Sequence, residues 1–151
     1  MPKASIKRLI ECRKKDLINL VLDIEKYPEF IPFCYDAKIY EKKEFNGLIK
    51  IIADLTIGKG PFKETYKSEV IYNQQKNTIQ VKNIDGPLNY LTNNWLFEEK
   101  KNQTKVTFDI DFEIKNKFLN SVMSASFQFG LQKIADAFQK RAEDLFSKSK
   151  N

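Results

Sequence analysis

The residues that could carry acid–base or metal chemistry are few. The sequence contains no histidine, and its two cysteines, Cys12 and Cys34, lie far apart without CxxC spacing. A histidine-dependent triad and a histidine-bearing metal site are therefore impossible. Two isolated cysteines are typical of free thiols in a reducing compartment. We predict no metal site, and we expect any acid–base chemistry to depend on Glu, Asp, Tyr or Lys.

Glu64 is the carboxylate whose position matters most. In a strand over residues 62–72, alternation places Glu64 on the same face as Phe62 and Tyr66. A carboxyl group desolvated there would have a raised pKa and could act as an acid or a base. Alternatively, strand curvature leaves Glu64 at the solvated rim, or a lysine pairs with it. We favour this alternative, and we predict no catalytic residue and no enzymatic activity.

Aromatic residues could build an apolar binding site. The chain has 12 Phe, 6 Tyr and one Trp, and such side chains fill cores but also line apolar pockets. Several of them lie in residues 27–34, where Pro28 and Pro32 prevent a long regular helix and allow at most a single helical turn between them.

Residues 27–34 have two interpretations. As structure, they form a lid that plugs the open end of a sheet. As function, they form the mobile rim of a portal for lipid, with Phe30 and Phe33 as its apolar edge. Such a rim could contact a bilayer, with Lys26 and Lys38 attracted to anionic head groups.

A second aromatic motif follows a Gly-Pro pair. Gly86 and Pro87 interrupt the strand pattern, which predicts a turn or bulge; contact with a ligand is the alternative. Trp95 and Phe97 follow on one side of the next strand. We interpret them as core aromatics first and as part of a cavity wall second, and the two roles can coincide.

A long C-terminal helix must position these side chains. Residues 116–146 contain no proline and would span roughly 45 Å as a helix. Gly130 within it either permits close packing on a sheet or leaves room for a ligand. Apolar residues at spacings of three and four predict the face that packs on the sheet. This stripe comprises Phe127, Leu131, Ile134, Phe138, Ala142 and Leu145.

Strands account for most of the remaining chain. Strict alternation over residues 104–115 predicts a strand with one buried and one solvated face, and Asn46-Gly47 predicts a two-residue hairpin. The other strands are expected at residues 3–11, 36–45, 48–57, 62–72, 78–84 and 90–99, and a short helix at 17–24. Because short links favour antiparallel pairing, we predict an α+β fold in which a curved antiparallel sheet of about seven strands wraps the long helix.

Charge and hydropathy constrain the location of the protein. The net charge of +6 comes mostly from lysine, which is ordinary for a soluble surface but also permits contact with RNA phosphates or a membrane. No apolar run approaches the ~18–20 residues that a membrane span needs, and the N-terminus lacks the apolar core of a signal peptide. We expect one domain over residues 1–151, cytoplasmic or peripheral at the inner membrane.

The order of elements resembles the helix-grip fold of the START-like superfamily, which includes polyketide cyclases. Residues 23–34, and residues 85–88 followed by Leu91, Trp95 and Phe97, are similar to motifs of the coenzyme Q-binding START-like proteins. That family also contains bacterial ribosome-association toxins of the RatA type. The resemblance implies a non-catalytic protein that binds a polyprenyl quinone or related lipid between sheet and C-terminal helix, without a cofactor.

Two positions depart from the family pattern, because Leu88 stands where Phe is common and Phe33 where Trp is common. Both changes are apolar and concern the shape of the lining. We predict a binding protein or chaperone for a ubiquinone-like lipid that supports respiration; the alternative is a toxin that binds the ribosome and blocks subunit association. Contact with a membrane surface fits either function, and DNA is not an expected partner.

The resemblance and the alternation together give the set of residues expected to line the lipid cavity and its portal. They are Tyr27, Pro28, Phe30, Pro32, Phe33, Leu55, Phe62, Tyr66, Pro87, Leu88, Leu91, Trp95, Phe97, Phe108, Phe112, Met123, Phe127, Gly130, Leu131 and Ile134.

Overall fold

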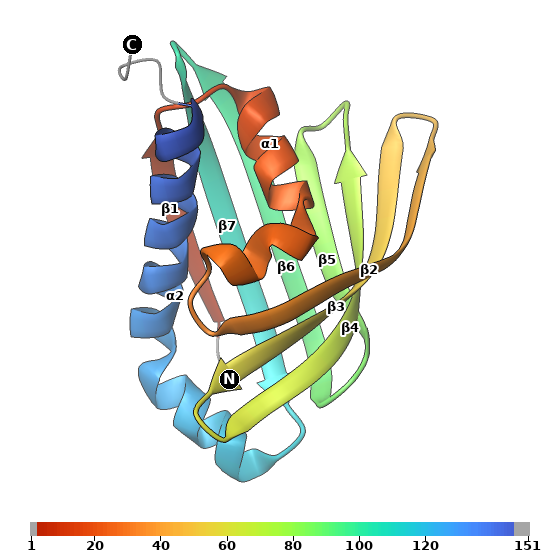
Figure 1. Cartoon of the computed structure of the whole chain (residues 1–151), viewed down its shortest axis with the longest axis vertical. Helices are drawn as coiled ribbons and strands as arrows, with labels where there is room; N and C mark the ends of the chain where they lie inside the picture. The colour runs from red at the N-terminus through yellow and green to blue at the C-terminus, as the bar shows by residue number, and fades with distance from the viewer. Residues whose placement is uncertain (1–2, 147–151) are drawn as a thin grey trace.

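A seven-stranded antiparallel sheet wraps one long helix, as predicted (Figure 1). The computed structural model describes residues 3–146, apart from the side chains of Lys59, Phe62, Leu119, Val122, Met123 and Ser126. The strand order is β1-β7-β6-β5-β4-β3-β2, so the first and last strands of the chain are neighbours. The elements are β1 (Lys3–Ile10), α1 (Lys14–Leu22), the 3-10 helix η1 (Ile24–Glu29), β2 (Cys34–Phe45), β3 (Leu48–Lys59), β4 (Phe62–Asn73), β5 (Thr78–Asp85), β6 (Leu88–Lys100), β7 (Gln103–Ile114) and α2 (Lys117–Phe146).

The hairpins form where the sequence predicts them. Asn46 and Gly47 have φ values of 50° and 79° between β2 and β3, as a type I′ turn requires. The twist of such a turn matches the twist of the flanking strands, so the two strands pair directly from Phe45 and Leu48 onward. The predicted hairpin is confirmed.

Gly86 forms the predicted turn between β5 and β6. Its φ is 130°, and a Cβ there would lie 2.9 Å from both Cα and Cβ of Tyr66. A shift in the β4–β5 register lies alongside, between Lys67 and Ser68. Only glycine fits this close approach of the two backbones.

The helical insert differs from its predicted bounds. Helix α1 begins at Lys14 and ends at Leu22, earlier than the predicted residues 17–24. Asp23 then joins it to η1, which contains Pro28. Helical hydrogen bonding continues past Pro28, because the N–H groups of Phe30 and Ile31 donate to the carbonyl of Tyr27, so a single turn between Pro28 and Pro32 does form. A short 3-10 turn tolerates Pro28 because it leaves few backbone N–H groups to be satisfied.

The apolar stripe of α2 is buried along most of its length. Leu131, Phe138 and Ala142 are buried, but Leu145 is 54% exposed, so its predicted place in the stripe is wrong. Phe146 packs against the core instead. Steps of four residues from Phe138 continue through Ala142 to position 146, and this row, not position 145, faces the sheet.

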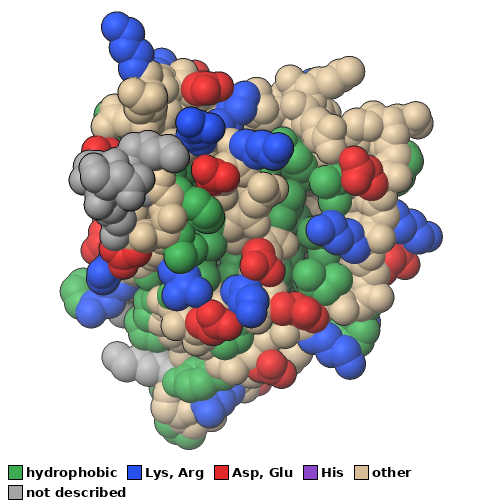
Figure 2. Space-filling model, turned by 45° about the horizontal axis from the view of Figure 1, so that its top comes forward, with side chains coloured by type: hydrophobic (Ala, Val, Ile, Leu, Met, Phe, Trp, Pro, Cys, Tyr) green, Lys and Arg blue, Asp and Glu red, His purple; other side chains and the backbone are tan. Residues whose placement is uncertain are grey.

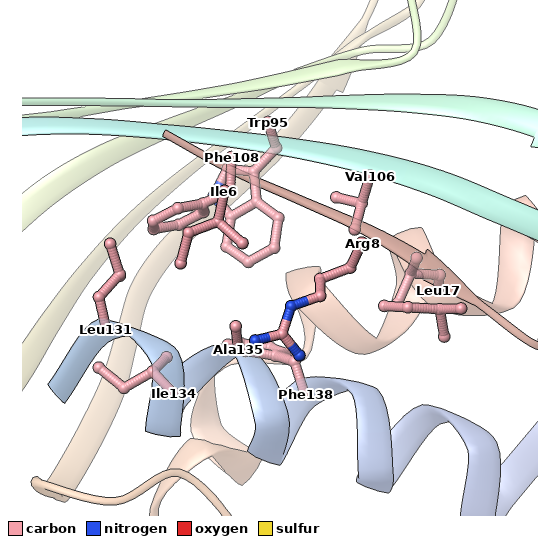
Figure 3. A pocket seen from close by; sticks show the side chains of 11 residues that line it. Ile6, Arg8, Leu17, Trp95, Val106, Phe108, Leu131, Ile134, Ala135 and Phe138 are labelled. Atoms are coloured by element: carbon pink, nitrogen blue, oxygen red, sulfur yellow. The ribbon is translucent and has the colours of Figure 1, made fainter. Parts of the chain in front are cut away.

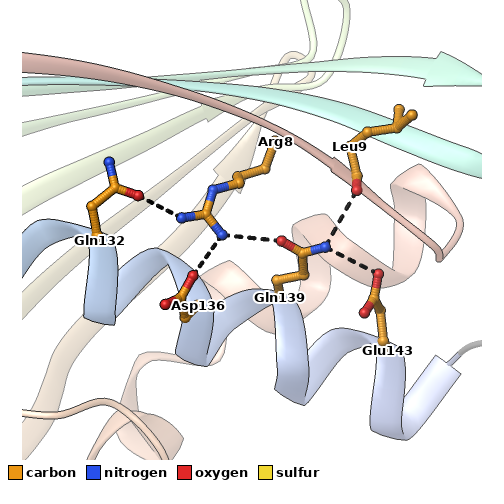
Figure 4. Close-up of polar contacts among 6 residues, drawn as sticks. All are labelled: Arg8, Leu9, Gln132, Asp136, Gln139 and Glu143. Atoms are coloured by element: carbon orange, nitrogen blue, oxygen red, sulfur yellow. Dashed lines mark hydrogen bonds and ion pairs between the residues drawn. The ribbon is translucent and has the colours of Figure 1, made fainter.

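Polar contacts fasten the second half of α2 to its neighbours (Figure 4). The Arg8 guanidinium on β1 donates to Asp136 at 2.8 Å, to Gln132 at 2.7 Å and to Gln139 at 3.1 Å. Arg141 pairs with Glu29 of η1 at 2.9 Å. Residues 131–146 of α2 are therefore held on two sides, by the edge strand and by η1.

Residues 117–130, the first half of α2, make different contacts. Phe127 packs edge-on against Phe112 of β7, with ring centroids 5.3 Å apart. The backbone N–H of Ile114 donates to the side-chain oxygen of Asn120 at 3.0 Å. This half lies at the end of the molecule where β3 turns into β4 (Figure 1).

Candidate functional site

The larger pocket lies on the concave side of the sheet, at the end covered by the first half of α2. Its volume is about 130 Å³. We call it the Tyr66 pocket. Its lining residues are Ile57, Gly58, Glu64, Tyr66, Pro87, Leu88, Leu91, Ile110, Phe112 and Ile114.

The register of four strands brings this lining together. Ile57 lies opposite Glu64 across β3 and β4, and Leu91 lies opposite Phe112 across β6 and β7. Alternation points all four toward the concave side. Gly86, in the turn between β5 and β6, lies close to the backbone of Tyr66 in β4. This close approach brings the start of β6 next to β4 at the pocket.

Tyr66 supplies a hydroxyl group to the lining, in which Glu64 is the other polar side chain. Burial, and to a smaller extent the Cys34 thiol, raises the pKa of Tyr66 well above its ordinary value of 10.0. No side chain that the structure describes forms a hydrogen bond with this hydroxyl. The group is therefore a neutral O–H donor over the whole physiological pH range, and it is available to a ligand.

Glu64 lies at the mouth of the Tyr66 pocket. Its side chain is exposed, although it belongs to the lining. An acid–base role would require the carboxyl group to be desolvated, and the exposed position agrees with the favoured interpretation that Glu64 occupies a solvated rim.

A cluster of aromatic rings fills the centre of the concave side. Phe138 of α2 makes edge-to-face contacts with Tyr27, Phe30 and Trp95, at centroid distances of 5.5, 5.4 and 5.3 Å. The Tyr27 hydroxyl donates to the carbonyl of Val21. Tyr27 and Phe30 thus pack on α2, and whether residues 27–34 form a lid or the rim of a portal stays a prediction.

A second, smaller space, which we call the Arg8 pocket, has a volume of about 30 Å³ (Figure 3). It has room for about one water molecule. Figure 3 shows the Arg8 side chain extending from β1 toward α2 beside it. The lining residues are Ile6, Arg8, Ile10, Leu17, Trp95, Val106, Phe108, Leu131, Ile134, Ala135 and Phe138.

The predicted site residues therefore divide into groups. Tyr66, Pro87, Leu88, Leu91 and Phe112 line the Tyr66 pocket, and Phe127 packs against its wall.

Trp95, Phe108, Leu131 and Ile134 line only the small Arg8 pocket. Phe97 is buried in the main core. Contact of either group with a lipid stays a prediction.

The remaining predicted residues lie near η1 and α2. Leu55 packs against the main core, Pro28 lies within η1, and Pro32 is half-buried after it. Phe33 lies against Gly130. The predicted Phe62 and Met123 side chains lie outside what the structure describes.

Five lining residues were not among those predicted for the lipid cavity: Gly58, Glu64 and the three isoleucines Ile57, Ile110 and Ile114. Alternation could have identified the three isoleucines. Ile57 shares a strand face with Leu55, and the other two share a face with Phe112.

Both cysteines are free in the structure, as predicted. Burial raises the pKa of Cys12 to about 12 and that of Cys34 to about 11. Both thiols are therefore protonated near neutral pH and poorly nucleophilic. Within residues 3–146, no group of three or more Cys, Asp or Glu side chains is arranged to hold a metal ion.

Residues 15–139 match the family of polyketide cyclase, dehydrase and lipid transport proteins. The match covers most of the chain, and the protein belongs to this family. The predicted helix-grip, START-like fold is confirmed by solved structures that cover nearly all of the chain. They include an 18 kDa protein of Caulobacter crescentus (TM-score 0.79, 23% identity, 96% of this chain and 98% of that one) and a START superfamily protein of Mycobacterium smegmatis (TM-score 0.77, 17% identity, 95% and 98%).

Relatives in the family carry two kinds of name. The ribosome association toxin RatA of Rickettsia prowazekii is 30% identical, over 91% of this chain and 94% of the toxin. The mitochondrial coenzyme Q-binding protein COQ10 of Dictyostelium discoideum is 29% identical over 87% of this chain, which spans 64% of that protein. An aromatase/cyclase of Streptomyces shares the fold at a TM-score of 0.74 and 13% identity, over 94% of this chain and 93% of that one, so binding proteins and enzymes occur on this scaffold.

A helix that spans a membrane needs about 20 mostly apolar residues. Within residues 3–146, none is both long enough and apolar enough to cross a membrane.

Proposed function

We propose that the protein is a non-catalytic binding protein for a lipid with a carbonyl-bearing ring, such as a polyprenyl quinone. The observation that carries this proposal is the Tyr66 pocket, a mainly apolar space of about 130 Å³ whose lining includes Tyr66, a half-buried residue with a hydroxyl group. The name of the Dictyostelium relative supports the same ligand class.

The volume of the Tyr66 pocket limits which part of a lipid can enter it. An apolar cavity of about 150 Å³ holds one benzene molecule, so a space of about 130 Å³ accommodates one six-membered ring or one isoprene unit. A polyprenyl tail of several units does not fit inside. The proposal therefore places a single ring or unit in the pocket and the rest of the chain outside its mouth.

The hydroxyl of Tyr66 gives a reason for the ring to enter first. Its O–H is neutral at physiological pH, as an ordinary tyrosine already is, and a carbonyl oxygen can accept its hydrogen bond. A hydrogen bond of this kind contributes about 0.5–1.5 kcal/mol, or roughly two- to tenfold in affinity. An isoprene unit offers no such acceptor.

Burial inside the pocket alone gives weak binding. At about 0.8 kcal/mol per CH₂ group, a five-carbon unit contributes roughly 4 kcal/mol before ordering costs, which corresponds to a millimolar dissociation constant. Tighter binding requires that the emerging chain contact further apolar surface, and the first half of α2 lies next to the pocket.

The test is the lipid content of the protein purified from its native host, measured by solvent extraction and mass spectrometry. We expect a stoichiometric quinone or related ring lipid, and at least a fivefold loss of it in Ile57→Phe, which fills the mouth of the pocket. Ile52→Phe is the matched control, because Ile52 lies on the same strand but faces the convex side. Absence of any ring lipid, or equal loss in both variants, contradicts the proposal.

A second candidate function is ribosome binding, favoured by the 30% identity to the Rickettsia toxin over nearly its whole length. It requires a clustered basic surface. On the face shown in Figure 2, Lys and Arg side chains alternate with Asp and Glu instead of gathering in one patch. Sucrose-gradient profiles of ribosomes at low salt distinguish the two functions, since unchanged subunit association after addition of the protein excludes this candidate.

A further inference from the structure

Charge is distributed unevenly from the end of β7 to the end of α2. Residues 114–135 contain no Asp or Glu, and their charged residues are Lys115, Lys117 and Lys133. Residues 136–146, in contrast, contain both signs, and Asp136 and Arg141 bind partners on β1 and η1. Residues 114–135 thus carry only positive charge, with Lys117 in the first half of α2, Lys115 just before the helix and Lys133 just after its midpoint.

The first half of α2 also has an apolar outer face. Phe118 and Phe129 are 69% and 67% exposed, more than any other large hydrophobic residue that the structure describes. They are eleven residues apart, which is about three turns, so they lie on the same side of the helix. Ala125, also exposed, lies between them on that side. We call this surface the outer face, defined by Phe118, Ala125 and Phe129.

The opposite side of the same half faces the sheet, because Phe127 packs on Phe112. The segment is therefore apolar on two sides, whereas a helix at a protein–water boundary is usually apolar on one. Two exposed phenylalanines on one helix face indicate a surface that binds something apolar. Lys133 lies beside this surface, with its ammonium group 4.8 Å from the Phe129 ring.

The outer face is next to the Tyr66 pocket. Phe112, against which this half of the helix packs, also lines the pocket. Figure 1 shows the first half of α2 at the same end of the molecule as the β3–β4 turn, whose strands supply Ile57 and Glu64 to the pocket mouth.

We propose that the outer face of α2 docks on the surface of an anionic lipid bilayer, with Phe118 and Phe129 inserted among the head groups. Lys115, Lys117 and Lys133, in a segment that contains no Asp or Glu, complement an anionic surface, and each contributes about fivefold to binding near such a surface. A bilayer accounts for the phenylalanines, the lysines and the adjacent apolar pocket together. Docking here would bring the pocket mouth to the lipid, without passage of the ligand through water.

The test is co-sedimentation of the full chain with vesicles of phosphatidylcholine and phosphatidylglycerol, compared with vesicles of phosphatidylcholine alone. We expect stronger binding to the anionic vesicles, weakened by salt. The double variant Phe118→Ser/Phe129→Ser should lower the partition coefficient roughly tenfold or more. The matched control is Phe45→Ser/Leu96→Ser, which removes exposed apolar side chains from β2 and β6 and should change binding less than twofold.

Several results would overturn this proposal. The first two are absence of binding to both kinds of vesicle, and equal losses of vesicle binding in the two double variants. The other two concern the Phe118→Ser/Phe129→Ser variant: it loses self-association, or it loses co-sedimentation with ribosomes, while its vesicle binding is unchanged. Because both phenylalanines are exposed, the variant should fold with an unchanged melting temperature. Failure here is distinguishable from failure of lipid binding, since Ile57→Phe should lower lipid content and leave vesicle partition intact.

Discussion

Phe33 lies with its aromatic ring against Gly130, so that a Cβ added at Gly130 would be 3.7 Å from the ring. Phe33 itself has a φ of 69°, a left-handed conformation that is uncommon for a bulky residue. This contact is where residues 27–34 meet the midpoint of α2. The contact agrees with a packing role for Gly130, although the partner is Phe33 and not the sheet, and room for a ligand there stays a prediction.

The first prediction concerns Gly130→Ala. A distance of 3.7 Å is an ordinary van der Waals contact, and alanine is favoured over glycine within a helix by about 1 kcal/mol. We expect the free energy of unfolding in urea to rise by up to about 1 kcal/mol. Gly86→Ala is the matched control and should lose about 2–4 kcal/mol, because its Cβ would meet Tyr66 at 2.9 Å and its φ is 130°. Destabilisation by Gly130→Ala would mean that Phe33 cannot adjust.

The second prediction compares two leucines of α2. Leu131 is 4% exposed and Leu145 is 54% exposed. Leu131→Glu should destabilise the protein by about 3 kcal/mol or more, because it buries an unpaired charge. Leu145→Glu should change stability by no more than about 0.5 kcal/mol. Thermal melts of both variants check this, and similar losses would show that the helix is rotated from the face described.

The third prediction concerns Tyr66→Phe. Loss of the hydroxyl should weaken binding of a short-chain quinone about two- to tenfold, since the carbonyl loses its donor. Stability should change little, because the hydroxyl makes no hydrogen bond with a described side chain. Tyr90→Phe is the control, since that hydroxyl binds Asp111 at 3.1 Å on another face. Fluorescence titration measures both affinities, and an unchanged affinity in Tyr66→Phe would remove this residue from the site.

The fourth prediction is a loss of stability in alkali. Burial raises the pKa of both Tyr27 and Tyr66 above 10.0. The folded state therefore holds these protons more tightly than the unfolded state. The stability they contribute is complete below about pH 10 and falls as pH rises toward the folded-state values, by at most about 1.4 kcal/mol per pH unit for each group.

Urea unfolding between about pH 8 and 11 checks this prediction. Cys12 and Cys34 add a similar loss that begins near their ordinary value of 9.0. Tyr66→Phe separates the contributions, because it removes one tyrosine and neither thiol. Its stability should fall less steeply above about pH 10 than that of the unmodified protein, and identical slopes would show that Tyr66 is not buried in solution.

Much of the architecture could be predicted from local patterns. Alternation in residues 104–115 and the Asn46-Gly47 pair predicted strand β7 and the β2–β3 hairpin, both of which form. These signals are local, because the period of a strand or helix and the preference of Asn and Gly for positive φ depend on neighbours in the chain. The burial of Leu145 was mispredicted. Helical periodicity shows which residues share a face, but it does not show where that face ceases to contact the sheet.

The sequence by itself determined the elements, their order and the family motifs, because each depends on residues close together in the chain. Only the tertiary structure decided which part of the concave side is open. Tyr27, Phe30 and Trp95 converge on Phe138 from three distant segments and fill the centre, while the space near Tyr66 stays open. A cavity is the small difference between the volume that the backbone encloses and the volume that side chains fill, and that difference exists only once the distant segments have met.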